Sequence, residues 1–323
     1  ASLCRGQLSG EHGGTVKPCR KHVAIAVVGG GLRGVIVTRA LAVLEEHLGQ
    51  SCGEIFSLAA GTSTGSIISA GIGIGKSGTE MYDLYCKLAT TVFPRTWRYY
   101  LWPLCRYKYP NGPLIATLKE QVGEMTMGEF WTSEPRKDVV ITVRDLVENR
   151  TRFVKPWKEE YRDWKVWKTV LSSCAVPTYF PVVDGRYVDG GVGSYTNPCY
   201  LAAFEAQFCL NWDPRETTLL SLGTGRVRNS IEQGEADRWF PWNWIGPVLD
   251  TFLSDTADLQ VRLVHQFFPD LDFRRFQVDL AEPIKVDDPS KIGELTEYGD
   301  KMGQMIINDQ VDPYTVRPAG VAA

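Results

Sequence analysis

Short apolar runs alternate along the chain with segments whose apolar residues recur at helical spacing. The apolar runs are bounded by polar or glycine residues and occur at 23–28 (VAIAVV), 54–61 (EIFSLAAG), 137–146 (KDVVITVRDL) and 217–225 (TTLLSLGTG). They predict buried strands. Helical spacing occurs at 35–49, from 66 onwards, and at 167–175, 197–208 and 256–267. This alternation predicts a three-layer α/β/α fold around a mostly parallel central sheet.

The chain reads as one domain, because no repeat, low-complexity tract or linker divides it. We expect one folded domain over residues 22–312, a flexible N-terminal segment over 1–21 and a C-terminal tail over 313–323. Segment 1–21 is polar and has no apolar core of a signal peptide, and a leader already removed stays an alternative. The uncharged stretch 55–75 is rich in Gly, Ser and Thr, which favours a buried strand, turn and helix over a transmembrane span.

Composition and charge narrow the function class. The 323 residues are 44% hydrophobic and 23% charged, which predicts a sizeable core. A net charge of -3 disfavours a bulk nucleic-acid binder. The eight cysteines form no C-x-x-C pair and no cluster with histidines at metal spacing, so we expect reduced thiols, no metal site and a cytoplasmic protein.

The glycine loop after the first predicted strand fits two kinds of site. Gly29, Gly31 and Gly34 match the G-x-G-x-x-G of a dinucleotide-binding loop. That motif also needs an acidic residue at the end of the second strand, where this chain instead runs into Gly61-Thr62-Ser63-Thr64-Gly65. The missing acid disfavours a nucleotide site.

The second reading is an acyl-transfer site. Ser63 is the central residue of a G-x-S-x-G between a predicted strand and helix, which is the setting of a nucleophilic serine. The backbone N–H groups of Gly29, Gly30 and Gly31 could stabilise the oxyanion that forms when a serine attacks an ester.

The base for Ser63 is less obvious than the nucleophile. Only His265 follows the serine in hydrolase order, and it lies within a predicted helix; the other histidines are His12, His22 and His47. Two aspartates stand in the stretch 181–198. Asp184 precedes a glycine between extended segments and predicts a hairpin turn. Asp189 ends an extended run before two glycines, where its carboxylate could act as a general base.

Four sequence blocks together resemble the patatin-like phospholipases. They are GGGLRG (29–34), GTSTG (61–65), SSCAVPTYFPV with GRYVDGG (172–191), and SLGTG (221–225), and FRRFQVDL (273–280) extends the match. The blocks have the family's order and cover roughly residues 23–226. The resemblance implies a patatin-like three-layer fold and a lipid acyl hydrolase that needs no cofactor.

Carried over by resemblance, Ser63 is the nucleophile, Asp189 is the base of a Ser–Asp dyad, and Gly29, Gly30 and Gly31 form the oxyanion loop. Arg33 occupies the family's basic position, with a role in supporting the loop or attracting a phosphate. The chain departs from the family pattern in having Val28 where the loop often begins with Asp, and Thr196 where an Asn is usual.

Two clusters of aromatic and basic residues suggest contact with a lipid surface. The first is FPRTWRYYLWPLCRYKYP (93–110), within a stretch from 87 to 119 that has six basic residues and no acidic one. The second is RWFPWNWIGPVLDTF (238–252). Aromatic and basic side chains favour the interface of an anionic membrane. The candidate lipid-facing residues are Trp97, Trp102, Trp239, Trp242 and Trp244, and the alternative is two loops packed over the core.

The leading hypothesis is therefore a lipid acyl hydrolase that cleaves acyl esters of glycerolipids and binds membranes peripherally. A carboxylesterase for soluble short-chain esters shares the same site and differs in its mouth. A lipid-binding or regulatory protein on the same fold is the non-enzymatic alternative.

Overall fold

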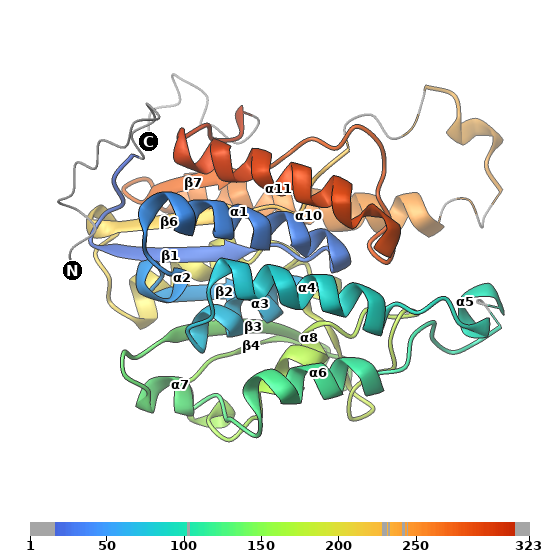
Figure 1. The fold of residues 1–323 in the computed structure, drawn as a ribbon, viewed down its shortest axis with the longest axis horizontal. Coiled ribbons are helices and arrows are strands. Elements are labelled where there is room, and N and C mark those ends of the chain that lie inside the picture. The colour runs from blue at the N-terminus through green and yellow to red at the C-terminus, as the bar shows by residue number, and fades with distance from the viewer. Residues whose placement is uncertain are drawn as a thin grey trace.

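A single mixed sheet runs through the centre of the molecule. The computed structural model describes residues 17–101, 104–227, 231, 233–240, 243 and 245–313. The strands are β1 (His22–Val27), β2 (Leu58–Gly61), β3 (Asp138–Asp145), β4 (Arg150–Val154), β5 (Tyr187–Asp189), β6 (Thr217–Leu222) and β7 (Asp272–Phe276). Their order is β4-β3-β2-β1-β6-β7, and β5 also pairs with β3 (Figure 1). Strands β3, β2, β1, β6 and β7 are parallel, while β4 and β5 are antiparallel to β3.

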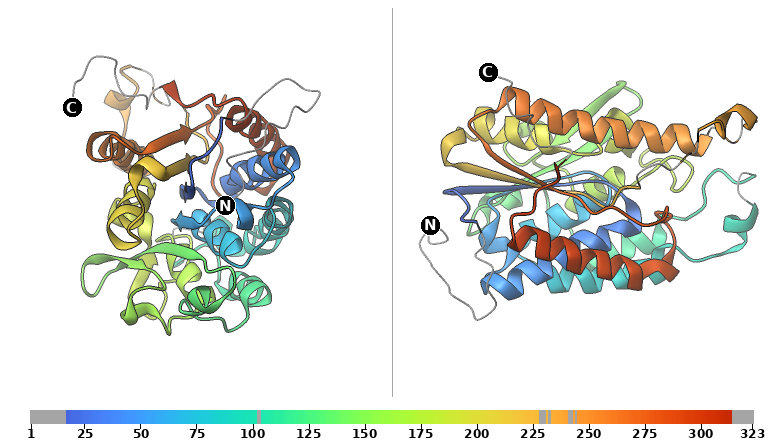
Figure 2. Two further views of the ribbon diagram at one scale, coloured as in Figure 1. Left: turned by 90° about the vertical axis from the view of Figure 1, so that its left-hand side faces the viewer. Right: turned by 90° about the horizontal axis from the view of Figure 1, so that it is seen from above.

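Helices cover both faces of this sheet (Figure 2). They are α1 (Gly34–Leu48), α2 (Cys52–Ile55), α3 (Thr64–Gly73), α4 (Gly78–Val92), α5 (Trp97–Leu101), α6 (Gly112–Val122), α7 (Glu129–Thr132), α8 (Val166–Ser173), α9 (Cys199–Phe204), α10 (Ile245–Phe267) and α11 (Ile292–Ile307). Ile25 and Val27 of β1 pack with α1 and α11, whereas Ala24 and Ala26 pack with α9 and α10. Successive residues of a strand point to opposite faces, so a strand buried on both sides has no polar alternation. The predicted three-layer α/β/α fold is confirmed.

Two predicted elements differ from the observed ones. Within 54–61 only β2 is a strand, because Ser51 and Glu54 form a capping box that starts the short helix α2 just before it. The predicted helix at 197–208 is α9 followed by a π-helical turn over Glu205–Cys209.

The two ends of the predicted domain are tied to the sheet. The Arg20 N–H donates to Thr218 Oγ1, and the Arg274 guanidinium donates to the carbonyl groups of Lys17 and Pro18. Residues 17–21 are therefore part of the folded body. Near the other boundary, Asp312 is buried and accepts two hydrogen bonds from the guanidinium of Arg226.

A buried ionic cluster fastens β5 to the sheet. Asp145 at the end of β3 is fully buried and accepts hydrogen bonds from Arg152 Nε at 2.7 Å and from Arg186 Nε at 3.2 Å. Burial alone would raise the pKa of Asp145, but the hydrogen bonds from Arg186 and Arg152 outweigh burial and hold it well below its usual range. Because Arg152 lies on β4 and Arg186 directly precedes β5, one carboxylate joins three strands.

We expect Asp145→Asn to lower the free energy of unfolding by roughly 3 kcal/mol at pH 7, because the buried Arg152 loses its buried charged partner and keeps only the more exposed Glu148 and Glu160. Urea denaturation measures the change. The matched control is Asp184→Asn, which breaks an exposed pair with Lys168 and should cost less than about 1 kcal/mol. Equal losses in the two variants would contradict a structural role for the cluster.

Candidate active site

Ser63 lies in a strained turn between β2 and α3. Its backbone has φ 54° and ψ −126°, a conformation rarely adopted by non-glycine residues. Such a turn at the end of a parallel strand projects a serine hydroxyl beyond the sheet. Ser63 is also the N-cap residue of α3, so the positive end of that helix lies next to its hydroxyl.

The turn requires backbones to approach one another closely. A Cβ atom added to Gly61 would lie 2.1 Å from the carbonyl oxygen of Gly65. One added to Gly65 would lie 2.2 Å from the carbonyl oxygen of Val27 in β1. Only glycine fits at these two positions, which explains both glycines of the G-x-S-x-G motif.

Three side chains that the sequence reasoning did not identify hold the peptide groups of Ser63. The Ser63 N–H donates to Ser173 Oγ at 2.9 Å. The Ser63 carbonyl accepts from Ser66 Oγ at 2.6 Å and from Cys174 Sγ at 3.2 Å. Ser173 and Cys174 belong to the sequence block SSCAVPTYFPV, so their place in the motif was the available signal.

The register of β3 brings Asp189 beside this turn. Along one edge of β3, Ile141 pairs with Gly61 of β2 and Val143 pairs with Asp189 of β5. Two residues advance a strand by roughly 6.5 Å. Asp189 therefore lies just beyond the end of β2, where Ser63 also lies.

The Asp189 carboxylate is buried and only partly satisfied. The side chain is 5% exposed; its Oδ1 accepts the Gly191 N–H at 2.7 Å, and its Oδ2 makes no full hydrogen bond within the described residues. Burial raises the pKa of Asp189 to about 6, although the Ser63 hydroxyl and the Gly191 N–H partly oppose that rise. A carboxylate with this pKa beside a serine hydroxyl is suited to accept a proton near neutral pH.

The three glycines after β1 differ in what their N–H groups do. The Gly29 N–H donates to the Thr196 carbonyl at 3.0 Å, so it is already engaged. Over the described residues, the N–H groups of Gly30 and Gly31 have no hydrogen-bond acceptor. A Cβ added to Gly29 would lie 3.1 Å from the Ser63 Cβ, which places this loop against the serine. Thr196 is thus a supporting residue, at the position where the chain departs from the family pattern.

The remaining candidates are placed as follows. Arg33 ends the single 3-10 turn after the glycines and is half-buried, and its N–H donates to the Gly30 carbonyl. Asp184 and Gly185 have φ of 52° and 67° in a turn closed by a Val183–Tyr187 bridge, which confirms the predicted hairpin turn.

The described histidines lie away from Ser63. His22 begins β1, at the opposite end of the sheet, and stacks on Trp212. His47 is in the last turn of α1, and His265 lies in α10 with its ring edge against Phe273. His12 is outside the described residues.

The candidate lipid-facing residues lie at the same end of the molecule as Ser63, as far as they are described. Trp97 begins α5, which projects from that end, and is 60% exposed (Figure 1). Trp239 is half-buried, and its neighbour Phe240 is exposed. Trp102, Trp242 and Trp244 lie outside the described residues.

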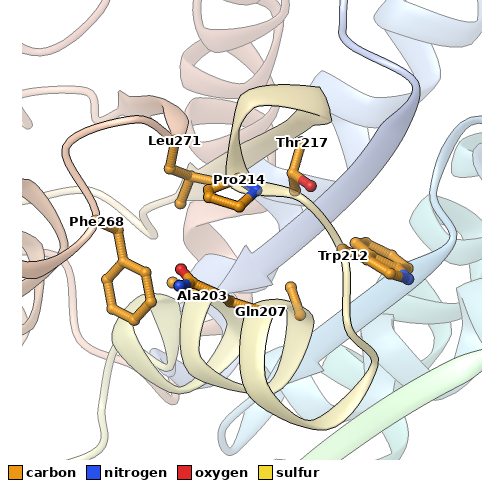
Figure 3. Close-up of a pocket in the computed structure, with 8 residues that line it drawn as sticks. Ala203, Gln207, Trp212, Pro214, Thr217, Phe268 and Leu271 are labelled. Atoms are coloured by element: carbon orange, nitrogen blue, oxygen red, sulfur yellow. The ribbon is translucent and has the colours of Figure 1, made fainter.

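Two hollows have linings that include neither Ser63 nor Asp189. One is bordered by Trp212, Thr217 and Phe268 (Figure 3). Thr217 pairs with His22, so this hollow is at the opposite end of the sheet from Ser63. The other, of about 290 Å³, is lined by Trp164, Lys168 and Tyr187. The described residues contain no group of three or more potential metal ligands and no helix long and apolar enough to cross a membrane.

Comparison with known proteins decides the family. A family model described as patatin-like phospholipase matches residues 25–203, more than half of the chain. The chain belongs to the patatin-like phospholipase family. The matched region contains the glycine loop, the Ser63 turn and Asp189.

Individual members of the patatin-like phospholipase family match at modest identity. An intracellular phospholipase A2 of Caenorhabditis elegans is 28% identical over 223 residues, covering 64% of this chain and 20% of that protein. A cGAMP-activated phospholipase of Vibrio cholerae is 29% identical over 201 residues, covering 56% of each. A cGAMP-activated phospholipase of Pseudomonas aeruginosa is 25% identical and covers 88% of this chain and 89% of that protein. The chain thus spans only part of the first two relatives.

The raised pKa of Asp189 predicts a pH-dependent gain in stability for Asp189→Asn. Because the folded-state pKa is about 6 and the ordinary value is 3.8, ionised Asp189 destabilises the fold as pH rises through 6. Relative to wild type, Asp189→Asn should gain about 2 kcal/mol of unfolding free energy between pH 4.5 and pH 7.5. Urea denaturation at both pH values measures the gain. A difference that does not change with pH would contradict the raised pKa.

Proposed function

We propose that this chain is a lipid acyl hydrolase that works through a Ser63 acyl-enzyme, with Asp189 as general base. One observation carries the proposal: a serine in a strained turn lies beside a buried carboxylate whose Oδ2 has no full hydrogen bond within the described residues. The substrate class rests on the family, whose members include phospholipases.

The acylation step follows from these groups. Asp189 Oδ2 accepts the proton of the Ser63 hydroxyl while Ser63 Oγ attacks the ester carbonyl carbon. The N–H groups of Gly30 and Gly31, which have no acceptor among the described residues, donate to the resulting oxyanion, and the N-terminus of α3 adds positive potential. Collapse of the tetrahedral intermediate expels the alcohol, which takes the proton from Asp189.

In deacylation Asp189 acts as general base again, with water as the nucleophile and Ser63 as the leaving group. Asp189 accepts a proton from a water molecule that attacks the acyl-enzyme carbonyl, and Ser63 leaves with that proton when the fatty acid is released. The Gly29 N–H takes no part in this scheme, because its bond to Thr196 anchors the loop instead. The cycle uses only groups of this chain and water.

The surface around α5 supports a lipid surface over a soluble ester as the substrate. Exposed apolar side chains gather on α5 and just after it, at the same end of the molecule as Ser63; they are Trp97, Tyr100, Leu101 and Leu104. The Arg98 guanidinium lies 4.9 Å from the centroid of the Trp97 ring. Apolar side chains interleaved with basic ones suit an anionic membrane interface.

Fatty-acid release from phospholipid and neutral-lipid vesicles, measured by mass spectrometry, tests the proposal. Ser63→Ala and Asp189→Asn should each lower release by at least about a thousandfold, because each removes a group that acts as a unit with the other. His265→Ala should retain wild-type release. The wild-type kcat/KM should rise with pH through about 6, since Asp189 must be ionised to accept a proton.

The outcomes separate the alternatives. Loss of release in His265→Ala with retention in Asp189→Asn would overturn the dyad. Cleavage of soluble short-chain esters without release from vesicles would establish a carboxylesterase. Absence of any reaction, including labelling of Ser63 by a fluorophosphonate, would favour a non-catalytic lipid-binding protein.

Membrane contact at α5 has its own test. Trp97→Ala should weaken binding to anionic phospholipid vesicles several-fold in a sedimentation assay, because an exposed Trp partitions into the interface. The control is Phe208→Ala, which removes an aromatic ring of similar exposure, 57%, at the far end of the molecule. Equal effects of the two substitutions would contradict a lipid-facing α5.

A further inference from the structure

The oxyanion loop, which contains Gly30 and Gly31, packs against a second loop at Val286 that the sequence analysis did not identify. The carbonyl of Val286 accepts the Leu32 N–H at 2.8 Å. Gly31 has φ 56°, and a Cβ there would lie 2.5 Å from the same carbonyl oxygen. The backbone of Val286 therefore fixes where Gly31 and Leu32 lie, and with them the Gly31 N–H.

The next residue, Asp287, carries a buried carboxylate. It is 4% exposed, and its Oδ2 accepts the Tyr109 hydroxyl at 2.9 Å and lies 3.4 Å from Lys108 Nζ. A buried carboxylate is costly unless it is paired and hydrogen-bonded. These two donors therefore determine where Asp287 can sit.

Tyr109 is held as firmly as its partner. Its ring is fully buried and contacts Phe93 and Phe180 with centroid separations of 5.1 and 5.9 Å. Its N–H donates to the Tyr179 carbonyl at 2.8 Å. The Tyr109 hydroxyl is thus a fixed donor, and its hydrogen bond determines the position of the Asp287 carboxylate.

A second link between the same segments lies at the surface. Arg95 and Asp288 form an ion pair at 3.2 Å, and Asp288 also accepts the Ser290 N–H at the start of a 3-10 turn. Exposed ion pairs contribute at most about 1 kcal/mol. The buried contact at Asp287 is therefore the stronger of the two.

We propose that Asp287 is a positioning residue for the oxyanion loop, acting through the Val286 carbonyl. The Tyr109 hydroxyl and Lys108 hold Asp287, Asp287 holds Val286, and Val286 sets Gly31 and Leu32. Lys108 and Tyr109 thereby determine the placement of an oxyanion donor. This inference rests on the proposed function, because it assigns a role in that reaction.

The test compares Tyr109→Phe, Asp287→Ala and the double variant. Each is assayed for kcat and KM on a soluble short-chain ester and for the rate of Ser63 labelling by a fluorophosphonate. We expect kcat and the labelling rate to fall about tenfold in each single variant, with KM within twofold, because a displaced donor loses part of its stabilisation of the oxyanion. The kcat of the double variant should be no lower than that of Asp287→Ala, since both substitutions break the same hydrogen bond between Tyr109 and Asp287.

Two further variants separate positioning from general stability. Asp287→Asn retains an oxygen that can accept the Tyr109 hydroxyl, so it should recover part of the lost kcat. Asp288→Ala breaks the exposed pair with Arg95 and the cap at Ser290 but leaves the contacts of Asp287 in place, so it should leave kcat unchanged.

Each result decides the matter. Unchanged kcat in Tyr109→Phe and Asp287→Ala, with an active wild type, would overturn the inference and leave the proposed function standing. If Asp287→Ala does not fold, Tyr109→Phe decides alone, because it removes one hydroxyl and keeps the ring packing. A wild-type chain that reacts with neither ester nor probe would overturn both the proposed function and this inference.

Discussion

The shared edge of β3 is the constraint on which the candidate site depends. Its first half pairs in parallel with β2, and its second half pairs with the antiparallel β5. The end of one partner and the end of the other therefore meet at one point along a single strand. Ser63 follows the first and Asp189 ends the second, although 126 residues separate them in sequence. The register of the sheet thus brings Ser63 and Asp189 together, which no local sequence motif could specify.

Two buried aspartates near this edge have pKa values shifted in opposite directions and serve different roles. Asp145 is buried with two arginines, and its pKa is low, so its charge is compensated and joins three strands. Asp189 is buried with one backbone N–H and a serine hydroxyl, and its pKa is about 6. The first carboxylate stabilises the fold, while the second is kept under-satisfied at a cost in stability. Asp145 lies two residues along β3 from Val143, the residue that pairs with Asp189. The ion pairs of Asp145 therefore secure β5, the strand that carries Asp189.

Much of this arrangement could be predicted from the sequence. Apolar runs bounded by polar or glycine residues located β1, β2, β3 and β6, and the G-x-S-x-G placed Ser63 correctly between a strand and a helix. The sequence could not reveal that the Gly29 N–H is engaged by Thr196, because that bond joins residues 167 positions apart. Nor could it reveal the contact of Val286 with Leu32, since a loop of ordinary composition carries no periodic signal. Helix α2 was missed because a local capping box outweighed the apolar pattern around it.

The antiparallel attachment of β5 also bears on when the chain becomes chemically competent. Strand β5 is only three residues long and joins β3 across more than forty residues of intervening chain. Such a short, non-local pairing gains too little by itself to form before the rest of the sheet is in place. A nascent or partly unfolded chain would therefore hold its serine and its carboxylate apart. On the proposed mechanism, the chain would therefore gain hydrolase activity only on completing its fold.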